Sequence, residues 1–232
     1  MSTHALTTED RGAFRNARRV NQALTARMEK RALTWMAERA PQWVTSDQLT
    51  LLGLGAQIAA GICYALTRWD RRALLLAIVC MALNWLGDSL DGTLARVRRQ
   101  ERPRYGFYVD HIVDTFGALA LIAGLGFSGY LHWQIAAGLL ICFYALSIEC
   151  YLATYTMGRF DLSRGIFGPT EIRVLLAVGN AFLTLHPYSQ IAGRRFLLFD
   201  VGGAVAIVGM LSMAVSAAFR HGVALYREET LS

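Results

Sequence analysis

The sequence predicts an all-α integral membrane protein, in which six transmembrane helices follow an amphipathic helix beside the membrane. Hydrophobic residues make up 54% of the 232 residues, and charged residues only 17%, against about a quarter in soluble domains. The apolar residues form long runs rather than alternating or amphipathic stripes. Each run is about long enough to cross ~30 Å of hydrocarbon, which is typical of membrane-spanning helices.

The first 46 residues are expected to form an N-terminal region that precedes a transmembrane domain at 47–232. Residues 1–8 indicate a tail, and residues 9–40 predict a helix, since they are rich in Ala, Arg, Glu and Leu and lack proline. Apolar residues roughly follow one face of this helix and arginines cover much of the rest, which favours a helix lying on the membrane surface. A solvated helix without lipid contact is the alternative. Pro41 is expected to end the helix, because proline cannot continue its hydrogen bonds.

The six membrane spans are expected in the remaining sequence, near 47–67, 72–92, 106–128, 132–156, 168–186 and 196–219. Ser46 or Asp47 is expected to cap the first of them, because both residue types accept hydrogen bonds from free helical N–H groups. Three glycines in this first span are expected to allow close packing against other helices: Gly53, Gly55 and Gly61.

The basic residues predict the orientation in the membrane. Of the 23 Lys and Arg residues, 17 fall in residues 1–46, the 93–105 loop, the 157–167 loop and the tail from 220. Five fall on the other side, and Arg173 lies inside a span. Since positive charge collects on the cytosolic side, both termini and the 93–105 loop should be cytosolic, in a multi-pass protein of the cell or inner membrane. Because the basic residues flank apolar spans, they favour lipid headgroups and substrate phosphates as partners, and no nucleic acid.

Four aspartates form the most informative pattern in the chain. Asp88 and Asp91 are three residues apart, and Asp110 and Asp114 are four apart. On helices each pair shares a face. A short polar loop joins the two helices, so they should be antiparallel and carry all four carboxylates at the cytosolic end, at similar depth.

Four carboxylates so close together cannot all ionise without compensation. Two divalent cations would balance their charge, and oxygen ligands suit Mg²⁺ or Mn²⁺. A pair of such ions clamps the entering and leaving oxygens of an in-line displacement at phosphorus. The aspartates therefore predict a two-metal site for phosphoryl chemistry.

The residues around the aspartates suit a substrate with a pyrophosphate. Gly92 and Gly106 leave space for a ligand to approach, and Ala95 keeps the neighbouring face small. Arg96 can bind phosphate oxygens with two parallel hydrogen bonds.

The combined pattern, D-x2-D-G-x2-A-R-x9-G-x3-D-x3-D, resembles the signature of the CDP-alcohol phosphotransferase (CDP-alcohol phosphatidyltransferase) family. The nine residues between Arg96 and Gly106 lie within the variation expected of it. Members have six transmembrane helices and an amphipathic N-terminal helix, so the resemblance spans nearly the whole chain. It implies Mg²⁺-dependent transfer of a phospho-alcohol from a CDP-alcohol to a hydroxyl in phospholipid biosynthesis, with release of CMP.

The resemblance also implies roles for individual residues. The metal ligands would be Asp88, Asp91, Asp110 and Asp114, and Asp114 is also a candidate base for the acceptor hydroxyl. The CDP pocket would be lined by Gly92, Ala95, Arg96 and Gly106. Family members commonly form homodimers, so a second copy of the chain and membrane lipids are expected partners.

The family divides by substrate, and two local features favour one branch. Some members join CDP-diacylglycerol to a polar alcohol such as inositol phosphate, glycerol phosphate or serine. Others join CDP-choline or CDP-ethanolamine to diacylglycerol. Asp110-His111 is similar to an Asp-His pair of the second group, and Pro169-Thr170-Glu171 resembles a Thr-Glu element in it. We therefore favour the second branch, with the first as the alternative.

The same features suggest a general base. His111 would deprotonate the acceptor, since an imidazole titrates near neutral pH, and Glu171 would orient it. Alternatively, His111 is only a polar neighbour of the metal site and Glu171 only caps the fifth span. Arg173 either binds a phosphate on the acceptor or simply pairs with Glu171, which is close to it in sequence.

Two competing interpretations concern the class of protein. A UbiA-type prenyltransferase also binds Mg²⁺-diphosphate through aspartates, and Asn84, Asp88 and Asp91 faintly resemble its first motif. Its spacing differs, however, and the Gly-x-x-Ala-Arg element would be unexplained. An ion or proton transporter would also use buried carboxylates, but it would carry them on several helices near mid-membrane.

Overall fold

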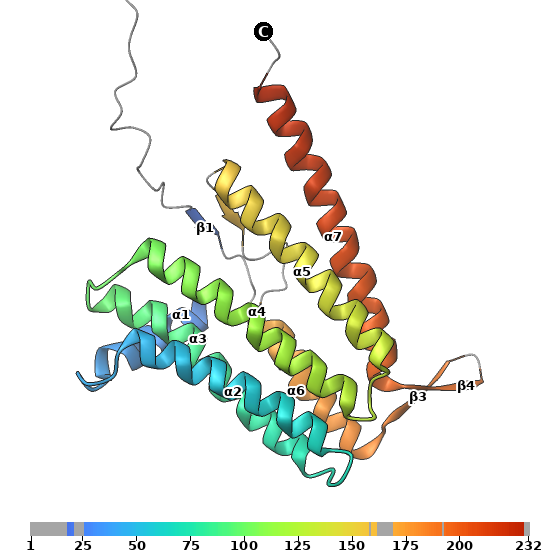
Figure 1. Ribbon diagram of the computed structural model, residues 1–232. Coiled ribbons are helices and arrows are strands. Elements are labelled where there is room, and N and C mark those ends of the chain that lie inside the picture. Colours follow the sequence, from blue (N-terminus) through green and yellow to red (C-terminus); the bar gives the residue numbers. More distant parts are fainter. Residues whose placement is uncertain (1–17, 21–25, 158, 162–168, 192, 230–232) are drawn as a thin grey trace, which may run out of the picture.

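The computed structural model describes residues 18–20, 26–157, 159–161, 169–191 and 193–229, which form a bundle of helices (Figure 1). The helices are α1 (Ala26–Arg39), α2 (Ser46–Leu66), α3 (Ala73–Val97), α4 (Pro103–Phe127), α5 (Trp133–Met157), α6 (Pro169–Leu185) and α7 (Leu198–Glu228). Two small sheets accompany them. Strands β1 (Arg18–Val20) and β2 (Arg159–Asp161) pair in parallel, and β3 (Tyr188–Ile191) and β4 (Arg194–Leu197) form an antiparallel hairpin. The predicted all-α membrane class is confirmed.

The six predicted spans correspond in order to α2 through α7. In the part of the chain that is described, α2, α3, α4, α5 and α7 are long and apolar enough to cross a membrane. Helix α6 has 17 residues and is shorter than these. Helix α3 continues to Val97 and α7 to Glu228, beyond the predicted ends at 92 and 219. The apolar run marks the hydrocarbon layer, whereas backbone hydrogen bonds carry the helix on into the polar region.

The prediction of one helix over 9–40 is wrong in part. Strand β1 occupies Arg18–Val20, where its backbone pairs with β2, and the described helix α1 covers Ala26–Arg39. The predicted end is right, because α1 stops at Arg39, just before Pro41. The predicted tail at 1–8 lies outside the described residues. The division of the chain after residue 46 stays a prediction.

Helix α1 packs onto α3 as part of the bundle. Leu33 and Ala37 of α1 are buried in one cluster with Leu90 and Leu94 of α3. One face of the amphipathic helix is therefore covered by protein rather than by lipid, while Trp35 is 57% exposed.

The cap of α2 is one residue earlier than predicted. The hydroxyl of Thr45 accepts a hydrogen bond from the backbone N–H of Gln48 at 3.2 Å, and the Gln48 side chain accepts from the Thr45 N–H at 2.9 Å. This reciprocal pair is a capping box. Ser46 and Asp47, the predicted caps, lie just inside the helix. The Ser46 hydroxyl donates instead to the backbone carbonyl of Asp91, 2.8 Å away on α3.

Glycines bring α2 and α3 into backbone contact. A methyl group on Gly87 would place its carbon 2.6 Å from both the Leu49 carbonyl oxygen and the Gly53 nitrogen. Close packing is thus confirmed for Gly53, and also for Gly61, whose neighbour is the backbone of α4 at Ala120. The prediction is wrong for Gly55, because a methyl group there would meet nothing within 4 Å. The α2–α3 contact lies directly beside Asp88.

Replacing Gly87 with alanine should force α2 and α3 apart. Overpacking of this kind costs about 1–3 kcal/mol, so we expect a lower midpoint in thermal unfolding of the detergent-purified protein. Gly55→Ala is the matched control on α2. It has room for the methyl group and gains helix propensity, so its midpoint should be unchanged or higher. Equal midpoints for the two variants would contradict the proposed contact.

Candidate metal centre

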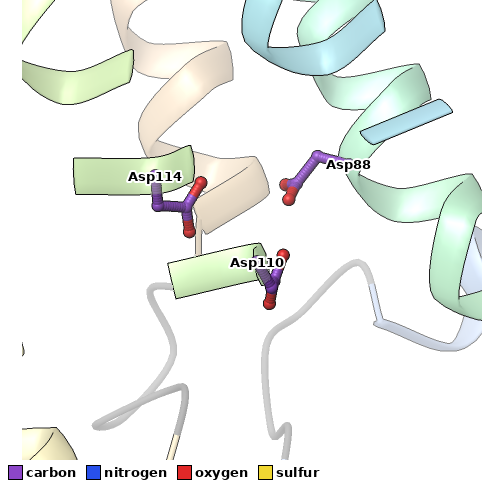
Figure 2. A group of neighbouring side chains, drawn as sticks. All are labelled: Asp88, Asp110 and Asp114. Carbon is purple, nitrogen blue, oxygen red and sulfur yellow. The ribbon is translucent and has the colours of Figure 1, made fainter. Parts of the chain in front are cut away.

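Three carboxylates from two helices meet near one end of the bundle. Asp88 comes from α3, and Asp110 and Asp114 come from α4 (Figure 2). Each offers a carboxylate oxygen, and these three atoms lie within 4.8 Å of one another. Helix α2 packs against both α3 and α4, so it fixes the position of one acidic helix relative to the other. All three side chains are partly buried.

The chemistry of this cluster fits a divalent cation. Like charges at this separation repel, and partial burial weakens their screening by water. Carboxylate oxygens are the ligands that hard cations such as Mg²⁺ and Mn²⁺ prefer. Asp88, Asp110 and Asp114 can therefore hold a divalent metal ion.

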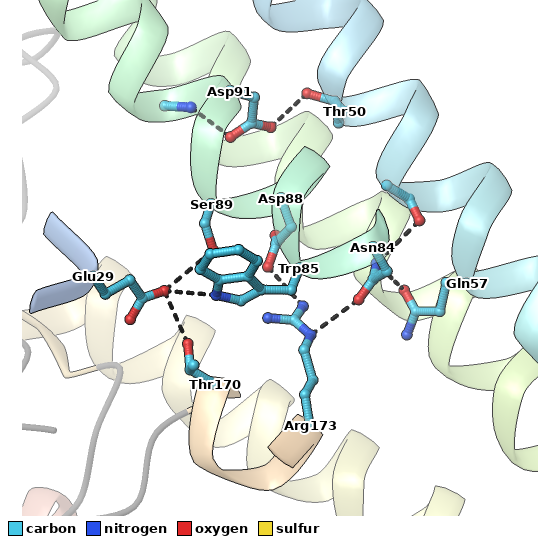
Figure 3. A network of polar contacts seen from close by, with 12 residues as sticks. Glu29, Thr50, Gln57, Asn84, Trp85, Asp88, Ser89, Asp91, Thr170 and Arg173 are labelled. Atoms are coloured by element: carbon cyan, nitrogen blue, oxygen red, sulfur yellow. Dashed lines mark hydrogen bonds and ion pairs between the residues drawn. The ribbon is translucent and has the colours of Figure 1, made fainter. Parts of the chain in front are cut away.

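The fourth predicted ligand, Asp91, faces a different neighbour. Its carboxylate accepts a hydrogen bond from the Thr50 hydroxyl of α2 at 2.6 Å and one from the Gly92 N–H at 2.5 Å (Figure 3). A step of three residues turns a helix by about 300°, so the Asp88 and Asp91 side chains diverge by about 60°. Among the described residues, the structure thus brings three of the four predicted ligands into one group.

Arg173 supplies a positive charge to the cluster. Its Nη2 donates to the Asp88 carboxylate at 2.6 Å, and its Nε donates to the Asn84 side-chain oxygen at 2.9 Å. The Asn84 amide in turn donates to the Gly53 carbonyl at 3.0 Å and to the Gln57 side chain at 3.3 Å. Figure 3 shows this chain of contacts from α6 through α3 to α2. The guanidinium is therefore held in a fixed orientation against Asp88.

Sequence reasoning did not find the Arg173–Asp88 pair. The expected partners of Arg173 were a phosphate on the acceptor or Glu171, whose side chain lies outside the described part of the structure. The available signal was the arginine itself, because a charged residue within an apolar helix requires a partner.

The residues predicted for the nucleotide pocket lie at the ends of α3 and α4 near the cluster. Gly92, Ala95 and Arg96 belong to the last turns of α3, and Gly106 to the first turn of α4. The Arg96 side chain is exposed and its Nη2 donates to the Thr93 hydroxyl at 3.1 Å. A methyl group on Gly106 would meet nothing within 4 Å, so space is open beside it. Their role in nucleotide binding stays a prediction.

His111 is held by its own helix and by aromatic rings. Its Nδ1 lies 2.5 Å from the Phe107 carbonyl oxygen. The centroid of the His111 ring lies 4.1 Å from that of the Phe107 ring and 4.8 Å from that of the Tyr151 ring. Because a carbonyl only accepts, this contact assigns the proton of a neutral ring to Nδ1 and leaves Nε2 as an acceptor. The predicted roles of His111 as base and Glu171 as its orienting partner stay hypotheses.

Comparison with known proteins provides independent information. A family model described as CDP-alcohol phosphatidyltransferase matches residues 43–219, which include every residue of the acidic cluster. A CDP-diacylglycerol–serine O-phosphatidyltransferase of Encephalitozoon cuniculi (strain GB-M1) is 31% identical over 172 residues, covering 69% of this chain and 41% of that protein. An uncharacterized protein of Aquifex aeolicus (strain VF5) is 35% identical over 129 residues, covering 56% of this chain and 59% of that protein. The chain thus spans roughly half the length of these relatives.

A solved structure shares the fold. The crystal structure of Mycobacterium tuberculosis phosphatidylinositol phosphate synthase with CDP-DAG bound aligns with a TM-score of 0.52 at 19% identity. The alignment covers 86% of this chain and 92% of that chain. At 19% identity, this similarity shows that the helices of the two proteins are arranged alike.

Replacing Asp110 with asparagine should weaken metal binding. The change keeps the size of the side chain but removes one charged ligand, so we expect Mn²⁺ to bind at least about tenfold more weakly, as for other perturbed metal sites. The electron paramagnetic resonance signal of free Mn²⁺ would be followed during titration of the purified protein without substrate. Glu38→Gln, on the exposed face of α1, is the control. Equal affinities for the wild type and Asp110→Asn would remove Asp110 from the site.

Proposed function

Because the chain belongs to the CDP-alcohol phosphatidyltransferase family, we propose that it transfers the phosphatidyl group of CDP-diacylglycerol to a polar alcohol and releases CMP. The observation that carries this proposal is the convergence of Asp88, Asp110 and Asp114 from two membrane helices inside the matched segment. The family match confirms the resemblance seen in the sequence. It also favours a transferase over the prenyltransferase and transporter interpretations.

The proposed donor differs from the one that the sequence favoured. The comparisons do not confirm a choline or ethanolamine donor with diacylglycerol as acceptor, and they fit the alternative better. The E. cuniculi relative is named for CDP-diacylglycerol and serine, and the mycobacterial structure contains CDP-DAG. Asp110-His111 and Pro169–Glu171 are short sequence elements. Their similarity to one branch of the family is therefore weak evidence for the groups that the donor and the acceptor carry.

The proposed reaction is one displacement at phosphorus. An oxygen of the acceptor forms a bond to the phosphorus that carries diacylglycerol, and the bond from this phosphorus to the CMP oxygen breaks. The acceptor's proton passes to Asp114 or to Nε2 of His111, and CMP leaves as a phosphate monoester. No oxidant or further co-reactant is required.

We propose that Asp88, Asp110 and Asp114 hold Mg²⁺ or Mn²⁺, and that Asp91, whose carboxylate contacts Thr50 in this structure, joins them when two ions bind. When bound, such ions supply charge stabilisation to the entering and leaving oxygens. Arg173 keeps Asp88 oriented toward the cluster. Gly92, Ala95, Arg96 and Gly106 would receive the CDP group, with the Arg96 guanidinium on its phosphates.

The arginine-rich connection between α3 and α4 supports a cytosolic site. Arg98, Arg99 and Arg102 lie between the two acidic helices in sequence, and such charge collects on the cytosolic side. We propose that the protein acts in the cell membrane with this end of the bundle in the cytosol, where CDP-activated and water-soluble substrates meet. Contact with membrane lipids and assembly into a homodimer remain predictions from the family resemblance.

A panel of substrates tests the proposed function. The purified protein with Mg²⁺ should release CMP from CDP-diacylglycerol when serine, glycerol phosphate or inositol phosphate is added, and chelation should stop the release. The acceptor that supports release identifies the substrate class. Release of CMP from CDP-choline or CDP-ethanolamine with diacylglycerol, but not from CDP-diacylglycerol, would overturn the proposed donor.

Replacing His111 with alanine tests the proposed base. General base catalysis contributes about 10²–10⁴-fold, so kcat should fall by at least about 100-fold, while KM for the donor changes little. His186→Ala, at an exposed position just after α6, is the matched control. Near-normal turnover of the His111 variant would leave Asp114 as the candidate base.

A further inference from the structure

One carboxylate oxygen of Glu29 links α1 to both α3 and α6. Oε1 of Glu29 accepts hydrogen bonds from Trp85 Nε1 at 2.9 Å and from the Ser89 hydroxyl at 3.3 Å, both on α3. It also accepts from the Thr170 hydroxyl at 2.9 Å, in the first turn of α6. Figure 3 shows these donors around Glu29, on the side of α3 away from Asp91. Hydrogen bonds to an ionised acceptor are stronger than those between neutral groups.

The three donors are neighbours of the residues that shape the acidic cluster. Ser89 directly follows Asp88, and Trp85 directly follows Asn84. Thr170 lies three residues before Arg173, on the same face of α6. Glu29 therefore contacts one face of α3 while Arg173 contacts the adjacent face through Asn84 and Asp88.

Two contacts on adjacent faces restrict how a helix can rotate. A rotation of α3 that moved Asp88 away from α4 would stretch the bonds from Trp85 and Ser89 to Glu29. A shift of α6 that moved Arg173 would break the bond from Thr170. We propose that Glu29 is a positioning residue that fixes Asp88 and Arg173 relative to each other, and so sets the affinity of the acidic cluster for metal. This inference rests on the metal site of the proposed function.

The opposite end of α1 is held independently of Glu29. The Arg98 guanidinium donates to the carbonyls of Ala40, Pro41 and Val44 at 3.1, 2.8 and 2.5 Å. Leu33 and Ala37 also stay buried against α3. Because these contacts do not involve Glu29, its removal leaves α1 docked. The positioning effect can therefore be separated from loss of the fold.

The test measures Mn²⁺ affinity in the full-length protein without substrate, by electron paramagnetic resonance. Glu29→Ala should bind Mn²⁺ about three- to tenfold more weakly, which is less than the roughly 10–100-fold caused by loss of a direct partner of a metal ligand, because Glu29 does not itself contact the aspartates. Thr170→Val keeps the side-chain shape and should weaken binding less. The double variant should bind Mn²⁺ no more weakly than Glu29→Ala does, because Glu29→Ala already removes the contact with Thr170. Glu38→Ala, exposed on the same helix, should bind as the wild type does.

Each outcome distinguishes this inference from the proposed function. Failure of the wild-type protein to bind Mn²⁺ would overturn the metal site, and with it the inference. Normal affinity in Glu29→Ala, with only a lower unfolding midpoint, would show a merely structural role and overturn the inference alone. If Glu29→Ala fails to fold, the Mn²⁺ affinities of Thr170→Val and Ser89→Ala test the inference instead. Normal affinity in both variants would overturn it.

Discussion

Mutual repulsion of carboxylates inside an apolar bundle is the constraint on which the other features depend. One carboxylate oxygen from each of Asp88, Asp110 and Asp114 lies within 4.8 Å of the others, and partial burial weakens the screening of their charges by water. Holding them together requires both opposite charge and rigid support. Arg173 supplies the opposite charge, and backbone contact between α2 and α3 at Gly53 and Gly87 supplies the rigid support. The cluster is therefore a property of several helices rather than of one motif.

The order and type of the helices could be predicted because apolar runs of this length are rare outside membrane-spanning helices. Where prediction failed, a competing local interaction was the cause. Strand β1 stands at Arg18–Val20, within the predicted helix, because its backbone pairs with β2, more than a hundred residues away in sequence. Thr45 capped α2 in place of Ser46 because Gln48 completes the reciprocal pair of hydrogen bonds. The hairpin of β3 and β4, before α7, also carries no strong sequence signal.

The candidate site was predictable to the extent that its residues share a helix. The spacing of Asp110 and Asp114 fixes a common face without knowledge of the fold. The spacing of Asp88 and Asp91 is less decisive, because a rotation of about 60° lets Thr50 draw Asp91 toward α2. Contacts of Glu29 with Trp85, and of Arg173 with Asp88, join residues 56 and 85 positions apart. No local pattern encodes them, so only the folded chain reveals them.

The contact between Gly53 and Gly87 has a consequence for the lipid donor proposed above. Two backbones that leave no room for a methyl group leave none for a fatty chain either. The seam between α2 and α3 is thus closed to the hydrocarbon of the bilayer beside Asp88. The acyl tails of the proposed CDP-diacylglycerol donor would therefore enter along another side of the bundle, so glycines that do not touch the lipid would restrict its direction of entry.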